Sequence, residues 1–119
     1  MASESGEGKR VMTINATLSE REKTHGLYRN QAACAQQLKN VMREMPGWKF
    51  LEYFQAQTLD ATADKIARIL AGNPDFKDHW VDIQGYAALV HRELEMLELE
   101  AAVGNTATGG RDHDEQQAG

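Results

Sequence analysis

Ionisable side chains gather between residues 65 and 86, on either side of a loop formed by Gly72, Asn73 and Pro74. Two helical patterns meet at this loop, and packing alone gives no reason to place cations, carboxylates and an imidazole there. Basic side chains bind phosphate groups, and carboxylates bind metal ions. The junction is therefore where the sequence predicts a site for a phosphate-bearing or metal-bound ligand.

The two basic residues before the loop, Lys65 and Arg68, border the apolar stripe of their helix. A cation in that position needs an anionic partner, which a nucleotide phosphate or a neighbouring Asp64 or Asp82 would each provide. A similar choice applies to Thr24-His25-Gly26. There, a hydroxyl, an imidazole and a flexible backbone at a helix break either receive an anion or form a turn.

His79, Asp82 and Tyr86 follow the loop and lie close together in angle at the edge of an apolar helical seam. A histidine three residues before an aspartate can orient its imidazole or share a proton, and it can equally well cap a core. On the ligand-binding interpretation, the residues expected to contact the ligand are Thr24, His25, Lys65, Arg68, His79, Asp82 and Tyr86.

Four aspartates repeat at helical spacing, Asp60 with Asp64 and Asp78 with Asp82. Magnesium prefers several oxygen ligands, and carboxylates four residues apart project from one face of a helix. If the protein is an enzyme, we expect these four aspartates to bind Mg²⁺, whereas binding without catalysis requires no cofactor. The structural alternative is that Asp64 pairs with Arg68 and that Asp78 neutralises a helix N-terminus.

The net charge of -5 is distributed unevenly along the 119 residues. Residues 20–92 carry ten Lys or Arg and nine Asp or Glu, which gives +1, whereas residues 93–119 carry one Arg and seven acids, which gives -6. Binding to nucleic acid needs a stripe of uncompensated cations. The balanced body of the chain therefore argues against a nucleic acid as the partner.

The single cysteine, Cys34, excludes an internal disulfide and favours a cytoplasmic location. No apolar run approaches the roughly 20 residues that span a bilayer, and the N-terminus lacks the apolar region of a secretory signal. We therefore expect a soluble protein that does not contact a membrane.

Apolar periodicity predicts an all-α fold, a three- or four-helix bundle. Ser19 and Glu22 form a capping box that indicates a helix start near Thr17. Further helices are expected over residues 28–45, 56–71 and 76–102, with an aromatic turn at 48–54 that fills the core. The apolar seam of the last helix consists of Trp80, Ile83, Ala87, Val90, Leu94 and Leu97.

The domain is expected to span residues 16–103, between a flexible N-terminal segment, 1–15, and a flexible acidic tail, 104–119, both of which lack periodicity. A chain this short buries a modest core and often gains stability from self-association. The seam of the last helix also continues further than a monomer of this size needs. We therefore expect a homo-oligomer in which residues 93–102 pair with a second chain.

Three motifs resemble a family of small phage and prophage proteins that is itself similar to the MazG type of all-α nucleotide pyrophosphohydrolases. They are Lys23-Thr24-His25-Gly26-Leu27-Tyr28, Lys65-Ile66-Ala67-Arg68-Ile69-Leu70 and Asp78-His79-Trp80-Val81-Asp82-Ile83-Gln84-Gly85-Tyr86-Ala87. The resemblance implies a MazG-like oligomer with a nucleotide pocket between facing helices, in the cytoplasm of a bacterial host. In MazG enzymes, acidic clusters Glu-Glu-x-x-Glu and Glu-x-x-Asp hold magnesium. The nearest matches here keep Asp60 from the first cluster, and His79 with Asp82 for the second.

Three functions follow from these observations. The leading hypothesis is a phage-encoded homo-oligomer that sequesters a nucleotide or a nucleotide-derived signal, because the cations remain while much of the acidic cage is replaced; such sequestration would counter a host defence. The second is a magnesium-dependent nucleoside triphosphate pyrophosphohydrolase. The third is an interaction module whose last helix docks on a host protein.

Overall fold

The computed structural model describes the backbone of residues 2–107 and the side chains of residues 13–104. Within that range the chain forms four α-helices, one 3-10 turn and no strand, which confirms the all-α class. The helices are α1 (Ala2–His25), α2 (Tyr28–Glu44), α3 (Tyr53–Ala71) and α4 (Lys77–Ala107), and the 3-10 turn η1 spans Trp48–Phe50. The chain divides into two units, residues 1–86 and 87–119, which are described separately.

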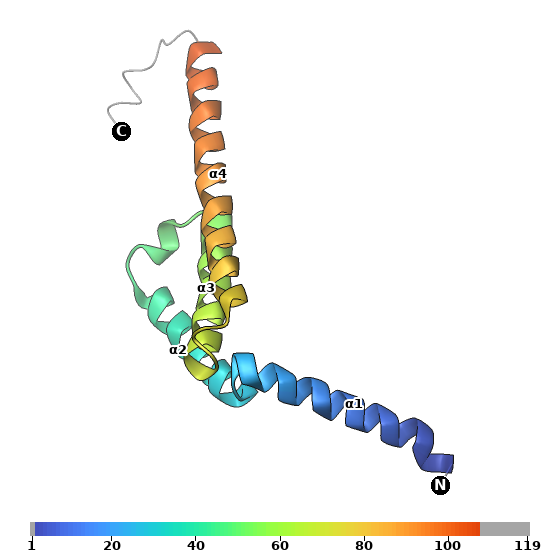
Figure 1. Cartoon of the computed structure of the whole chain (residues 1–119). Coiled ribbons are helices and arrows are strands. Elements are labelled where there is room, and N and C mark those ends of the chain that lie inside the picture. The colour runs from blue at the N-terminus through green and yellow to red at the C-terminus, as the bar shows by residue number, and fades with distance from the viewer. Residues whose placement is uncertain (1, 108–119) are drawn as a thin grey trace. The chain divides into compact units, whose positions relative to one another are not determined.

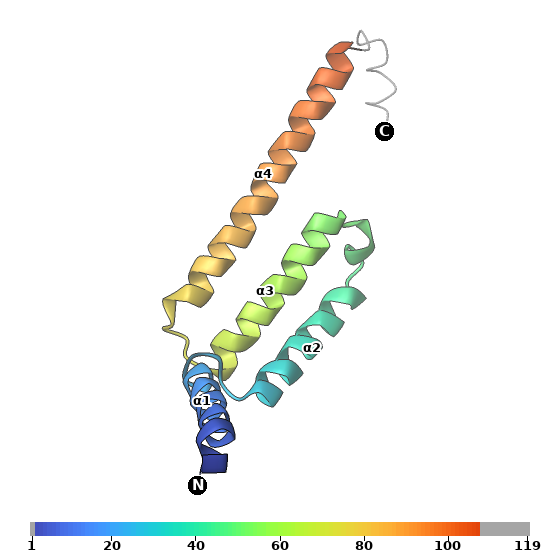
Figure 2. The same ribbon diagram turned by 90° about the vertical axis from the view of Figure 1, so that its right-hand side faces the viewer.

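The centre of the first unit is an antiparallel hairpin of α2 and α3, which lie side by side in both views (Figures 1 and 2). The buried apolar residues of these two helices are mainly small, namely Ala35, Ala63 and Ala67, together with Ile69. Alanine side chains allow two helix backbones to approach closely, so this core contains little apolar volume. It is therefore the backbone, more than large side chains, that fills the space between these two helices.

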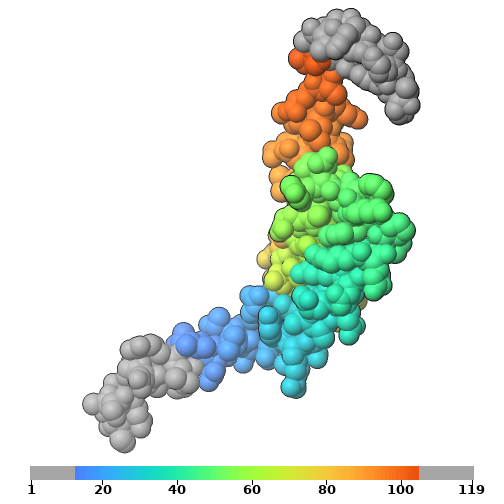
Figure 3. Space-filling view, turned by 180° about the vertical axis from the view of Figure 1, so that it is seen from behind, coloured from blue at the N-terminus to red at the C-terminus, as the bar shows by residue number. Residues whose placement is uncertain are grey.

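The connection between α2 and α3 does not fill the core, so that prediction is wrong. Phe50 is 78% exposed and Tyr53 is 95% exposed, and the outer face of this segment is visible in the space-filling view (Figure 3). An interface of alanines leaves no cavity for large rings. Helix α3 also begins earlier than expected, because the backbone N–H of Glu52 donates to Oε1 of Gln55 at 2.8 Å and caps the helix there.

The start of the first helix differs from the sequence prediction. Helix α1 begins at Ala2, and Thr17 lies inside it, where its hydroxyl donates to the carbonyl of Thr13 at 2.9 Å. Glu, Lys, Arg and Met are good helix formers, so residues 2–16 can be helical without an apolar stripe. The flexibility expected of residues 1–15 stays a prediction. Residues 104–107, which were expected to belong to the flexible tail, continue α4. The rest of the expected tail, residues 108–119, lies outside the described residues.

The first turn of helix α4 buries a different side chain than its apolar seam predicts. His79 is 1% exposed, whereas the neighbouring Trp80 is 52% exposed and donates from Nε1 to the carbonyl of Pro74 at 2.7 Å. The seam prediction is therefore wrong in the first turn of α4. In the second unit, exposed apolar side chains follow the helix at Leu89, Leu94, Met96, Leu97, Leu99 and Val103. Among the described residues, no helix is long and apolar enough to cross a bilayer.

Candidate anion site at the end of helix α1

Two glycines bring the end of α1 into backbone contact with the loop between α3 and α4. Gly26 has a φ of 79°, a conformation that favours glycine, and a Cβ there would collide with the carbonyl of Ala71. A Cβ on Gly72 would collide with the backbone of Thr24 and His25. Each glycine therefore permits a close approach that no other residue allows, and together they fix Thr24 and His25 against the loop.

The carbonyl oxygen of Thr24 joins three segments of the first unit. It accepts a hydrogen bond from the backbone N–H of Asn73 at 3.1 Å and another from Nε2 of His79 at 3.1 Å. Because a carbonyl can only accept, the second bond requires the proton of His79 on Nε2. His79 is buried and engaged in this way, so it positions the end of α1 and does not present Nε2 to a ligand.

The imidazole of His25 lies beside this joint. Its Nδ1 is 2.6 Å from Oγ1 of Thr24, and its ring meets the ring of His79 edge to face at 4.7 Å between centroids. The Phe76 ring meets His79 edge to face at 4.9 Å between centroids and lies 6.3 Å from the His25 ring. The hydroxyl of Thr24 donates its single proton to the carbonyl of Arg21 at 3.1 Å, so Nδ1 of His25 donates to the hydroxyl oxygen.

Burial and nearby basic side chains both favour the neutral form of His25. Desolvation by burial and the neighbouring Arg21, His79, Arg68 and Lys65 lower the pKa of His25 to about 4, so its ring is neutral at pH 7. The pKa of a histidine falls in this way where a further positive charge is unfavourable. The response of His25 therefore indicates a positive electrostatic potential at the end of α1.

One carboxylate partly balances these cations. Lys65 donates to Oδ2 of Asp82 at 2.6 Å, and that hydrogen bond holds the pKa of the Asp82 carboxyl below its usual range. Arg68 lies near both His25 and Asp82, yet its Nε is buried and has no hydrogen-bond partner among the described residues. The Nη atoms of the same guanidinium are not among the buried unpaired atoms, so they are the donors of Arg68 that an anion can reach.

The structure gathers six of the seven residues expected to bind a ligand: Thr24, His25, Lys65, Arg68, His79 and Asp82. Tyr86 lies further along α4, half-buried, and no interaction joins it to the other six within the described chain. The sequence left two possible partners for Lys65, a phosphate or a neighbouring aspartate. The structure pairs Lys65 with Asp82 and, within residues 13–104, leaves Arg68 without an aspartate partner.

The four aspartates expected as magnesium ligands are not gathered in one place. Asp60 pairs with Arg43 at 2.8 Å and Asp64 with Lys39 at 2.9 Å, so both lie against α2, whereas Asp82 lies against Lys65. The expected pairing of Asp64 with Arg68 is replaced by the contact with Lys39. Within residues 13–104, no group of three or more His, Cys, Asp or Glu side chains is arranged to hold a metal ion.

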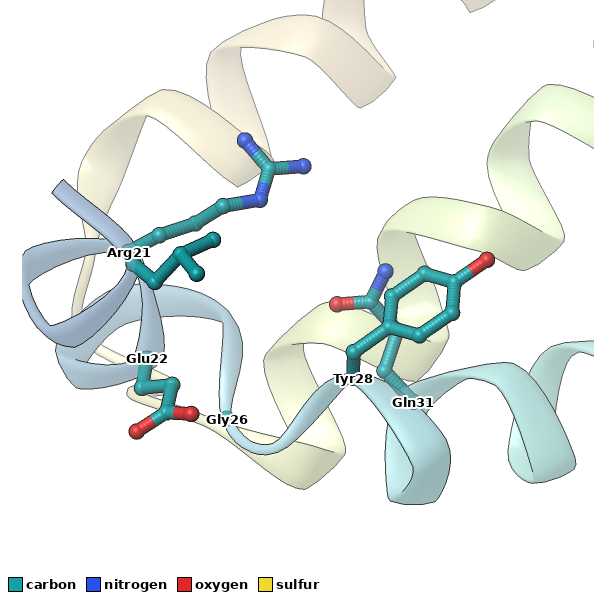
Figure 4. Close-up of a pocket in the computed structure, with 6 residues that line it drawn as sticks. Arg21, Glu22, Gly26, Tyr28 and Gln31 are labelled. Atoms are coloured by element: carbon teal, nitrogen blue, oxygen red, sulfur yellow. The ribbon is translucent and has the colours of Figure 1, made fainter. Parts of the chain in front are cut away.

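A pocket of about 230 Å³ adjoins this junction between α1 and α2, lined by Leu18, Arg21, Glu22, Gly26, Tyr28 and Gln31. Arg21 lies on one side of it, and Tyr28 and Gln31 lie on the other (Figure 4). Gln31 is 7% exposed, whereas Tyr28 is 74% exposed. Arg21 belongs both to this pocket and to the cations around His25.

Sequence reasoning missed Arg21 and Gln31 as members of the site. Arg21 precedes His25 by four residues, so both project from the same side of α1, and this spacing was available as a signal. No comparable signal marks Gln31, because an isolated glutamine in an amphipathic helix is usually solvated.

Comparison with known proteins leaves the site to be interpreted from its geometry, since no protein-family model, curated protein or solved structure matches this chain.

Proposed function

We propose that this protein binds a nucleotide or nucleotide-derived molecule by its phosphate groups at the end of α1. The observation that supports the proposal is the imbalance of charge there. Burial is the largest cause that lowers the pKa of His25, and its neighbours Arg21, Arg68 and Lys65 are cations that lower it further, whereas Asp82 is the carboxylate paired with Lys65. Phosphate oxygens are the acceptors that arginine and lysine bind most strongly. The Nη atoms of Arg68, which are not among the buried side-chain atoms and make no hydrogen bond within the described chain, offer donors for such an oxygen.

Binding in this proposal occurs without hydrolysis and without a metal. Asp60, Asp64 and Asp82 each bind a basic side chain, so none of them is left to hold magnesium with the others. If the resemblance to phage proteins holds, the protein would act in the cytoplasm of a bacterial host. There it would remove a nucleotide signal on which a host defence depends.

Binding is tested by calorimetry with ATP, GTP, CTP, UTP and inorganic tripolyphosphate in EDTA. The wild-type protein should bind tripolyphosphate, and Arg68→Met should weaken that binding by about 10- to 150-fold, since a charge-assisted hydrogen bond contributes roughly 1.5–3 kcal/mol. Lys49→Met is the control, because Lys49 lies exposed in η1. The proposal is wrong if none of the five compounds binds, or if Arg68→Met binds as the wild-type protein does.

The alternative functions predict different results. A magnesium-dependent pyrophosphohydrolase would release pyrophosphate from a nucleoside triphosphate and would lose this activity in Asp82→Ala. An interaction module would bind no nucleotide and would depend instead on the exposed apolar residues of α4, Leu94 and Leu97 among them. Those residues support, in addition, the proposal of a homo-oligomer, because large exposed apolar surfaces are usually covered by a partner.

A further inference from the structure

The pocket beside the cations differs from them in character. Its lining combines one cation, Arg21, with one carboxylate, Glu22, so its charge is balanced. The Glu22 carboxylate would repel a phosphate group, whereas it does not repel an uncharged ring. The walls that remain, Leu18 and Tyr28, offer an apolar side chain and an aromatic face.

The size of the pocket indicates that it would enclose only a part of a ligand. Sites that enclose a whole drug-sized ligand have volumes of roughly 300–1,000 Å³. This pocket has a volume of about 230 Å³, so it suits one ring system with the remainder of the molecule outside. Arg21 lies at its edge and also near His25, so the part left outside would lie toward the cations.

Two side chains have the chemistry to recognise a planar heterocycle. The Tyr28 ring stands largely exposed at the pocket, and aromatic faces stack on nucleobases of any type. Gln31 is 7% exposed and lines the pocket, and its amide lies beside the Tyr28 ring (Figure 4). The amide makes no hydrogen bond within the described chain, and it is not among the side-chain atoms that are buried without a partner, so a ligand in the pocket can reach it. An amide offers both a donor and an acceptor, and the edge of a nucleobase supplies partners for both.

We propose that this pocket binds the base of the nucleotide, stacked on Tyr28 and hydrogen-bonded to Gln31, while the phosphates extend past Arg21 toward Arg68. This inference rests on the proposed function, because it assigns the base and the phosphates of one molecule to adjoining parts of one site. It adds that the protein discriminates among bases, since an amide presents a fixed arrangement of one donor side and one acceptor side.

The test compares nucleoside triphosphates with inorganic tripolyphosphate, which has the phosphates and lacks the base. At least one of ATP, GTP, CTP and UTP should bind the wild-type protein about tenfold or more tightly than tripolyphosphate does, as expected from stacking on one aromatic ring. The four nucleotides should also differ from one another. Equal affinity for tripolyphosphate and all four nucleotides would overturn the base pocket and leave the anion site intact.

Substitutions of Tyr28 test whether the pocket causes the preference for a nucleotide over tripolyphosphate. Tyr28→Leu should reduce the best nucleotide to the affinity of tripolyphosphate without changing tripolyphosphate binding, whereas Tyr28→Phe keeps the ring and the preference. Tyr53→Leu is the matched control, because Tyr53 is the exposed tyrosine at the start of α3. Tyr28 is itself largely exposed, so its replacement does not threaten the fold. A nucleotide preference that survives Tyr28→Leu would overturn the proposal.

Gln31→Leu gives a second, independent measurement. It should make the four nucleotides bind with similar affinity while stacking on Tyr28 still favours them over tripolyphosphate. Unequal affinities that persist unchanged in Gln31→Leu would contradict the role of the amide. If the wild-type protein binds neither tripolyphosphate nor any nucleotide, the proposed function itself fails, and this result is distinct from the two outcomes above.

Discussion

Acidification should destabilise the protein through His25 before the carboxylates are protonated. In the folded chain the pKa of His25 is lowered to about 4 from 6.5, by burial first and then by Arg21, His79, Arg68 and Lys65. Between these two values the unfolded chain binds a proton and the folded chain does not, so stability is present above pH 6.5 and is lost as the pH falls toward 4.

The magnitude follows from linkage. With those two pKa values, a change from pH 7.5 to pH 5 costs about 2 kcal/mol, and about 1–2 kcal/mol once solvent screening of a part-buried ring is allowed for. Asp82 does not add to this loss, because the hydrogen bond from Lys65 lowers the pKa of its carboxyl and keeps it ionised in this window.

The assay is urea unfolding at pH 7.5 and pH 5 for the wild-type protein and for His25→Asn, whose amide N–H can replace Nδ1–H as a donor to Thr24. The variant should lose about 1 kcal/mol less than the wild-type protein between the two pH values. His91→Asn is the control, because the His91 side chain is 74% exposed on α4 and faces Glu95. Equal losses in wild-type protein and His25→Asn would refute the electrostatic reasoning.

Three further predictions concern the backbone contact, the charge balance and the apolar helix. Gly26→Ala should destabilise the fold by about 1–3 kcal/mol in thermal or urea unfolding, because Gly26 has a positive φ and a Cβ there would collide with Ala71. Gly85→Ala should instead stabilise the fold by about 0.5–1 kcal/mol, because Gly85 lies inside α4 and a Cβ there meets open space. Asp82→Asn should strengthen tripolyphosphate binding in calorimetry, because it removes the carboxylate that balances Lys65; weaker binding would favour a ligand-holding role for Asp82. Joint replacement of Leu94 and Leu97 by Glu should lower the mass found by light scattering to that of a monomer, and a wild-type protein that is already monomeric would contradict the oligomer.

Local signals in the sequence were sufficient for the C-terminal ends of α1, α2 and α3, although not for the starts of α1 and α3. Pro46 and Gly47 stop α2, and Gly26 and Gly72 mark the two breaks around which the site forms, because these residues act through the backbone alone. The clustering of Lys65, His79 and Asp82 was also predictable, since all three flank one short loop.

Tertiary packing determines which side chains are buried and which partners the aspartates bind, and local sequence patterns did not predict either. Apolarity placed Trp80 inside, yet His79 is buried, because a polar ring can donate to the Thr24 carbonyl and pack against His25 and Phe76. The aspartates share a helical spacing that suits a metal, but spacing does not tell which neighbour a carboxylate faces. In the fold, Asp60 and Asp64 face the basic residues of α2.

An anion that binds beside His25 should change the pKa of that imidazole, which NMR can measure with and without tripolyphosphate. Without the anion, His25 should titrate near 4, because it is part-buried among cations. A bound anion would neutralise their field, so the pKa should rise by about one unit or more. A pKa near 6.5 in the absence of any anion, or one that tripolyphosphate leaves unchanged, would contradict the account.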